Sequence, residues 1–141
     1  MNDLWPEDIG HPTLRSPVSI LREQALLLGD KTQNMVRAKV SPQERQEQNN
    51  FKYTFFIVAP ELGDYHHALF KIRHDVELYP VVIDVDEEIR YELAPEEDKT
   101  IIANSESEFL EMLRRIFRAK KTRKVIHALL AQSSAYQDNS F

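Results

Sequence analysis

The sequence predicts an α+β domain: a mostly antiparallel sheet of four or five strands, with an N-terminal helix and two C-terminal helices packed on one face. Three observations support this class. Strand-like segments follow one another through short turns, amphipathic helical patterns stand at both ends, and 141 residues suit one core. Strands joined by short turns pair antiparallel, and three amphipathic helices can cover one face of such a sheet.

The N-terminal helix is predicted from Pro17 to Leu28. Serine at position 16 is a preferred N-cap, proline is favoured in the first helical position, and Gly29 stands where helices commonly end. Six apolar residues share one broad face of a helical wheel, namely Val18, Ile20, Leu21, Ala25, Leu27 and Leu28. Residues 1–15 are predicted to be an extended arm, because proline and glycine interrupt a polar segment there.

Strand patterns occupy the middle of the chain. The segment Phe51 to Ala59 is rich in aromatic and β-branched residues and is ended by Pro60, which predicts a central strand. Residues 41–50 are wholly polar and predict a mobile loop. Other strands are expected at residues 33–40, 65–74, 79–85, 89–93 and 100–103.

The C-terminal third predicts two helices. Ser105 and Glu108 have the spacing of a capping box, so a helix should run from Glu106 to about Arg118. The helical spacing of apolar residues is interrupted near residues 120–122 and then resumes, which predicts a turn followed by a second helix. Residues 133–141 lack periodicity and are predicted to be disordered, so the domain itself should span residues 16–132.

Composition excludes several classes of site. The chain has no cysteine, so it can form no disulfide, thiolate metal site or thiol nucleophile. Its three glycines are isolated and provide no phosphate-binding loop. No segment approaches the roughly 20 apolar residues of a membrane-spanning helix, and the acidic N-terminus differs from a signal peptide, so we expect a cytoplasmic protein without membrane partners.

Charge is distributed unevenly along the chain. Residues 1–60 hold seven charges of each sign, residues 61–108 hold fourteen acidic against four basic residues, and residues 109–141 hold two acidic against seven basic residues. This separation predicts either pairing inside the fold or a bipolar surface.

The basic run lies at residues 114–124 and contains seven cations. The candidate partner-binding residues are Arg114, Arg115, Arg118, Lys121 and Lys124. Such a run can bind carboxylates of an acidic protein or phosphates of a nucleic acid, or it can be a solvated helix face.

The acidic run at residues 84–98 contains eight carboxylates and no glycine, so it lacks the pattern of a calcium-binding loop. We predict a solvated loop here. The alternative is that this run meets the basic helix, either within the fold or on a second copy in a dimer. Asp84 or Asp86, followed by Glu97 and Lys99, weakly resembles the Asp…Glu-x-Lys pattern of metal-dependent nucleases, but Glu97 and Lys99 fall in a predicted loop.

One group of residues could bind a transition metal or support catalysis: Asp64, His66, His67, His74, Asp84 and Asp86. On a regular strand, His66 and His74 would share a face, but about 26 Å apart, whereas His67 would point to the other face. We therefore expect neither a metal nor a cofactor.

These observations predict a non-enzymatic protein-binding or regulatory module that presents a segregated acidic and basic surface to a protein partner or to a second copy in a homodimer. The first alternative is a nucleic-acid-associated protein that uses the basic helix at 114–124. The second alternative is a metal-dependent enzyme of unrecognised type.

Overall fold

The computed structural model describes residues 1–42, 50–95 and 100–138, and it contains one five-stranded antiparallel sheet. Each strand lies beside its neighbour in the sequence, in the order β1-β2-β3-β4-β5. The strands are β1 (Arg37–Pro42), β2 (Phe51–Ala59), β3 (Tyr65–His74), β4 (Val81–Val85) and β5 (Ile101–Ala103). The helices are α1 (Pro17–Lys31), the 3₁₀ helix η1 (Pro60–Leu62), α2 (Glu87–Leu93), α3 (Glu106–Arg118) and α4 (Lys120–Asp138).

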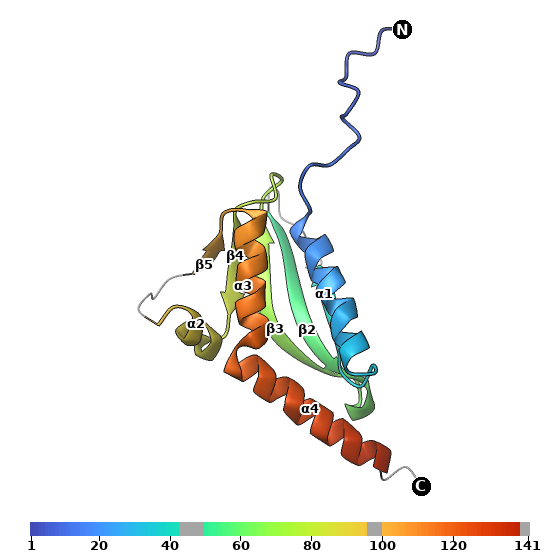
Figure 1. The fold of residues 1–141 in the computed structure, drawn as a ribbon, viewed down its shortest axis with the longest axis vertical. Helices are drawn as coiled ribbons and strands as arrows, with labels where there is room; N and C mark the ends of the chain where they lie inside the picture. Colours follow the sequence, from blue (N-terminus) through green and yellow to red (C-terminus); the bar gives the residue numbers. More distant parts are fainter. Residues whose placement is uncertain (43–49, 96–99, 139–141) are drawn as a thin grey trace.

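The helices α1 and α3 lie on the same side of the sheet, and α4 crosses its lower end (Figure 1). The predicted α+β class, with one N-terminal and two C-terminal helices beside an antiparallel sheet, is confirmed. The core forms between these helices and the sheet. Its sheet residues include Phe55, Ile57, Phe70, Ile72, Val81 and Ile83, and its helix residues include Ile20, Leu21, Phe109, Leu113 and Ile116.

A bulge interrupts the pairing of β2 with β3. Phe55 pairs with Phe70, but the next residue, Phe56, pairs with Ala68, so Leu69 has no partner across the strands. An extra residue reverses the alternation of side chains along a strand. Ala68 is therefore exposed and Leu69 is buried, whereas the alternation of a regular strand would place Ala68 on the same face as Phe70.

The strand predicted at residues 89–93 is wrong, because this segment belongs to α2. The carboxylate of Asp86 accepts a hydrogen bond from the backbone N–H of Ile89 at 2.8 Å and caps the helix. Ile89 and Leu93 are both buried, and their spacing of four residues places them on one helical face. The acidic run predicted to be a loop is thus helical over Glu87–Leu93.

The two C-terminal helices meet at Ala119, whose backbone is extended, close to the predicted turn. The hydroxyl of Thr122 donates to the carbonyl oxygen of Ile116 at 2.6 Å and ties the start of α4 to the end of α3. The prediction of disorder from Ser133 is wrong for residues 133–138, which continue α4. Ser133 is fully buried, one helical turn after the buried Leu129.

Candidate functional site

The predicted basic residues of the C-terminal helices do not form one patch. Arg115 points toward α2 and donates to the carbonyl oxygen of Leu93 at 2.8 Å. Lys121 forms an ion pair with Glu88, also on α2, at 3.3 Å. Arg114 and Arg118 instead line a hollow beside α1, and Lys124 is exposed.

The acidic segment meets the basic helix within the fold, as one of the predicted alternatives proposed. Besides the contacts of Arg115 and Lys121, the backbone N–H of Lys120 donates to the carboxylate of Glu92 at 3.1 Å. Helix α2 therefore supplies carboxylates and a carbonyl to the junction of α3 and α4. Of these three contacts, the ion pair of Lys121 with Glu88 joins two oppositely charged side chains.

The group of aspartates and histidines is dispersed. The bulge in β3 places His66 opposite Val58 and His74 opposite Phe51, so these two histidines lie on different faces, contrary to the shared face expected for a regular strand. Asp86 is a helix cap. Within the described ranges, no three histidine, cysteine or acidic residues are placed to hold a metal ion. Glu97 and Lys99 of the partial nuclease pattern lie outside the described residues.

His74 and Asp64 also have local roles. The ring of His74 stacks against Phe51 and Tyr53, with centroid separations of 5.6 and 6.1 Å, and its Nδ1 contacts the carbonyl oxygen of Asp75 at 2.7 Å. Asp64 occupies the left-handed backbone region in the turn before β3, and its carbonyl oxygen contacts His66 Nδ1.

The most unusual charge distribution lies on the face of the sheet opposite α1 and α3. Residues paired across antiparallel strands point to the same face. Arg37 pairs with Val58, Lys39 pairs with Phe56, Lys52 pairs with Arg73, and Thr54 pairs with Lys71. All five lysines and arginines of the strands therefore share one face, which we call the basic sheet face: Arg37, Lys39, Lys52, Lys71 and Arg73.

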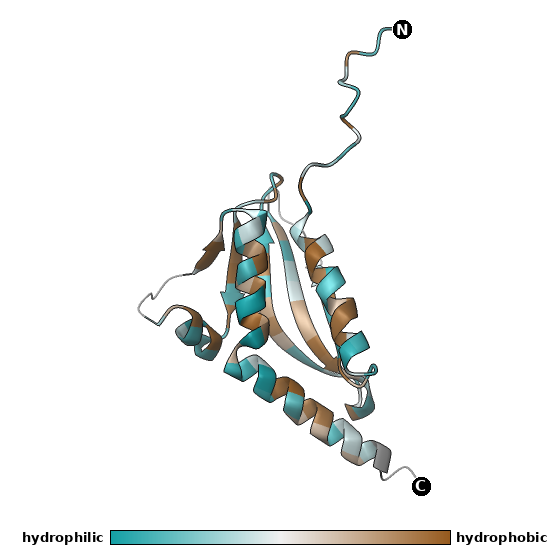
Figure 2. Cartoon of the chain, viewed as in Figure 1, coloured by the Kyte–Doolittle hydropathy of each residue, from teal (hydrophilic) through white to brown (hydrophobic). Residues whose placement is uncertain are grey.

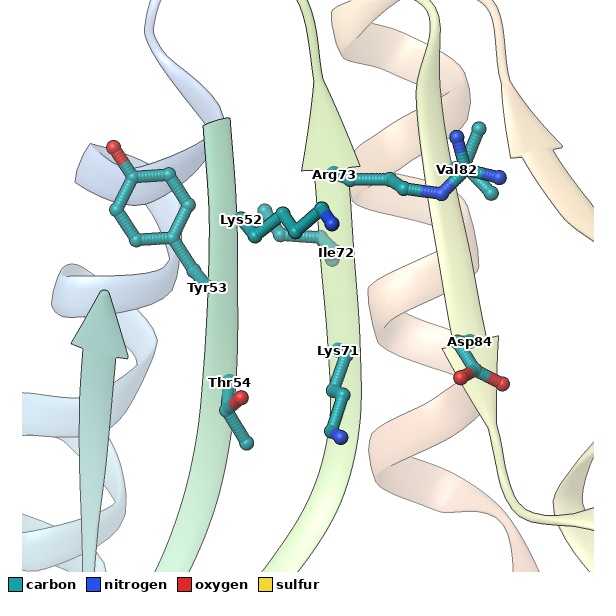
Figure 3. A pocket seen from close by; sticks show the side chains of 8 residues that line it. All are labelled: Lys52, Tyr53, Thr54, Lys71, Ile72, Arg73, Val82 and Asp84. Atoms are coloured by element: carbon teal, nitrogen blue, oxygen red, sulfur yellow. The ribbon is translucent and has the colours of Figure 1, made fainter. Parts of the chain in front are cut away.

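Figure 3 looks onto the basic sheet face, with the helices behind the strands. Lys52, Lys71 and Arg73 surround an open hollow of about 460 Å³ that spans β2, β3 and β4. The side chain of Arg73 extends from β3 toward Val82 on β4 (Figure 3). The helices α1 and α3 lie on the other side of the sheet (Figure 1), and Lys71, Arg73 and Asp84 are exposed on this face.

One carboxylate, Asp84, lies among the strand residues, and its register partner is Lys71. Among the described residues, no carboxylate lies within ion-pair distance of Lys71 or Arg73. Lys52 and Arg73 are direct register partners, and like charges in opposite positions disfavour each other. Basic charge on this face is thus concentrated and only partly compensated.

Apolar side chains are interspersed with these cations. Phe56 is half-buried and packs edge-on against the exposed ring of His66, with centroids 5.7 Å apart. On β4 and β5, Val82 pairs with Ile102, and half of the Ile102 surface is exposed. The basic sheet face therefore presents exposed apolar side chains beside its cations.

Comparison with known proteins provides no relative for this chain. No protein-family model matches it, and neither a curated protein nor a solved structure is significantly similar to it. Within the part of the chain that the structure describes, every helix is too short or too polar to cross a lipid bilayer.

The basic sheet face could not be predicted from the sequence, because its five cations come from three separate segments. Arg37 and Lys39 alternate with apolar residues, as do Lys71 and Arg73, and each pattern on its own predicts only a half-buried strand. The missing information was the register, which places the cations of β1, β2 and β3 side by side.

Proposed function

We propose that the protein is a non-enzymatic binding module that takes an acidic segment of a protein partner on the basic sheet face. The observation that carries this proposal is the presence of five strand cations and one strand carboxylate on the face of the sheet opposite α1 and α3. A partner with carboxylates beside apolar side chains would complement both the charge and the exposed apolar surface. The planar guanidinium of Arg73 suits fork-shaped contacts with a carboxylate.

Acidic side chains next to this face favour a protein partner over a nucleic acid. Asp84 lies on the face itself, and Asp86, Glu87 and Glu88 follow directly after β4 at the start of α2. A phosphate backbone that crossed from β3 to β4 would approach these carboxylates and be repelled. A folded protein or peptide can place its own charges to avoid them.

The proposal can be tested with defined probes. A glutamate- and leucine-rich synthetic peptide should bind the protein in a fluorescence anisotropy titration at low salt. The double variant Lys71→Glu with Arg73→Glu should weaken this binding by about tenfold or more, because it reverses two adjacent charges on the contact surface. Circular dichroism should confirm that the variant folds, since both side chains are exposed.

A matched control is available on α4. Arg123 and Lys124 are exposed, and their reversal to glutamate changes the net charge by the same amount at a site away from the sheet. This control should leave peptide affinity within about twofold of the wild type. Equal loss in both variants would show that overall charge, rather than the basic sheet face, determines binding, and would contradict the proposal.

Nucleic acids provide the second comparison. A single-stranded RNA and a DNA duplex of similar length should bind more weakly than the acidic peptide. Tighter binding of either one would contradict the proposal and favour a nucleic-acid partner. On duplex DNA, the logarithm of the affinity should then fall against the logarithm of the salt concentration with a slope of about −0.9 per phosphate neutralised.

A further inference from the structure

A second surface lies on the helical side of the molecule, between α1 and α3. A groove of about 300 Å³ has Phe55 and Ile57 of β2 as its floor. Its apolar walls come from all three surrounding helices, with Leu27 and Leu28 on α1, Phe117 on α3 and Ile126 on α4. An adjoining hollow shares four of its lining residues, Gln24, Lys31, Phe117 and Arg118, so the groove continues along α1 and α3.

The rim of this groove is cationic. Lys31 at the end of α1 and Arg118 at the end of α3 line both parts of it, and Arg114 lines the second. All three side chains are exposed. Arg114 and Arg118 belong to the basic run that the sequence singled out, but their setting is an apolar groove rather than a continuous basic patch. Such a groove fits a segment with bulky apolar residues and negative charges.

The N-terminal arm has this composition. Residues 1–10 contain three carboxylates, Asp3, Glu7 and Asp8, and no lysine or arginine. Trp5 is 73% exposed, and the neighbouring Leu4 and Ile9 are exposed as well. The hydrophobic segments of the arm lie far from the hydrophobic core (Figure 2). A Trp side chain can bury about 150–250 Å² when it is enclosed, so its exposure leaves much binding free energy unused.

Contacts at Arg15 fix the direction in which the arm leaves the domain. Its backbone N–H donates to the carboxylate of Glu106 at 2.8 Å, and its carbonyl oxygen accepts from the hydroxyl of Tyr79 at 3.0 Å. Its guanidinium pairs with Glu23 on α1. From this anchor the arm extends away from the sheet and helices (Figure 1), so it does not enter the groove of its own domain.

We propose that the arm of one copy docks into the groove between α1 and α3 of a second copy, with Trp5 in the apolar part and the arm's carboxylates near Lys31 and Arg118. The charges are complementary, and the arm already points outward. A reciprocal exchange of two arms would enclose both tryptophans. This inference does not depend on the basic sheet face, which lies on the opposite side of the sheet.

Trp5 is the single tryptophan of the chain, so intrinsic fluorescence reports on the arm directly. We expect its emission maximum to shift to the blue as the wild type is concentrated from about 1 µM to about 500 µM. Sedimentation velocity should show a change from monomer to dimer over the same range. Lys31→Glu with Arg118→Glu should raise the dimer dissociation constant by about tenfold or more, because it places like charges against the arm.

A charge exchange tests the pairing itself. Adding Asp3→Lys, Glu7→Lys and Asp8→Lys to the rim variant should restore dimer formation, whereas the arm changes alone should weaken it. The sheet variant Lys71→Glu with Arg73→Glu should dimerise like the wild type, so a failure of this inference can be distinguished from a failure of the proposed function.

Three results would overturn the inference. The first is a monomer whose Trp5 emission stays that of a solvated indole at every concentration. The second is a blue-shifted Trp5 in a monomer, which would mean that the arm occupies the groove of its own domain. The third is a dimer that neither the rim nor the arm substitutions affect.

Discussion

The hydroxyl of Tyr79 donates a hydrogen bond to the carbonyl oxygen of Arg15 at 3.0 Å and so joins the loop before β4 to the residue that precedes the α1 cap. Burial raises the pKa of Tyr79 above its ordinary value of 10.0, and the nearby Glu106 carboxylate raises it further, while Arg15 opposes both. The neutral hydroxyl is thus the form that folding favours.

This relationship predicts a loss of stability in alkaline solution. Because the pKa of Tyr79 is raised on folding, its contribution is fully present below about pH 10 and is lost as the pH rises through the raised pKa. Tyr79→Phe should cost about 0.5–1.5 kcal/mol of unfolding free energy at pH 7, since it removes one hydrogen bond. Urea unfolding at several pH values should show a shallower alkaline decline for the variant, and an identical decline would contradict this assignment.

Two leucines on α3 provide a matched test of packing. Leu113 is 2% exposed and lies in the core, whereas Leu110 is 39% exposed on the same helix. Leu113→Ala should lower the free energy of unfolding by about 2–5 kcal/mol, because it removes buried methyl groups and leaves a cavity. Leu110→Ala should cost well under half as much, and equal losses in urea titrations would mean that the described face of α3 is not the buried one.

Substitutions at Asp86 and Asp84 test whether these carboxylates act as a helix cap or as metal ligands. Asp86→Ala should cost about 1 kcal/mol, because it removes the side-chain acceptor at the start of α2. Asp84→Ala should change stability by less than about 0.5 kcal/mol, as expected of an exposed strand residue. Mg²⁺ or Zn²⁺ should leave the melting temperature of both variants and of the wild type unchanged. A metal-dependent rise in the wild type that both variants lose would favour a metal site instead.

The sequence predicted the parts of the fold that local rules determine. The caps at Ser16 and Ser105 predicted both helix starts, and the aromatic segment predicted β2. The bulge at Leu69 could not be predicted, because it depends on the pairing of β3 with β2 rather than on β3 alone. The four-residue spacing of Ile89 and Leu93 fits either a strand or one turn of a helix. The hydrogen bond of the Asp86 cap favours the helix.

The candidate site was less predictable than the fold for the same reason. The basic run along the C-terminal helices is continuous in sequence and therefore conspicuous, but the structure divides it between α2 and the groove beside α1. The basic sheet face is assembled from residues up to 36 positions apart, between Arg37 and Arg73. Single segments of the sequence do not predict a surface that depends on the register of several strands.

The two edge strands of the sheet affect whether copies of the chain can associate by strand pairing. The edge strand β1 carries Arg37 and Lys39 and ends at Pro42, and the edge strand β5 has only three residues. Charged side chains, proline and short length all discourage another chain from adding a strand to an exposed edge. Both backbone edges of the sheet are therefore poor templates for fibre-like growth, and we expect any contact with other molecules to involve side-chain surfaces instead.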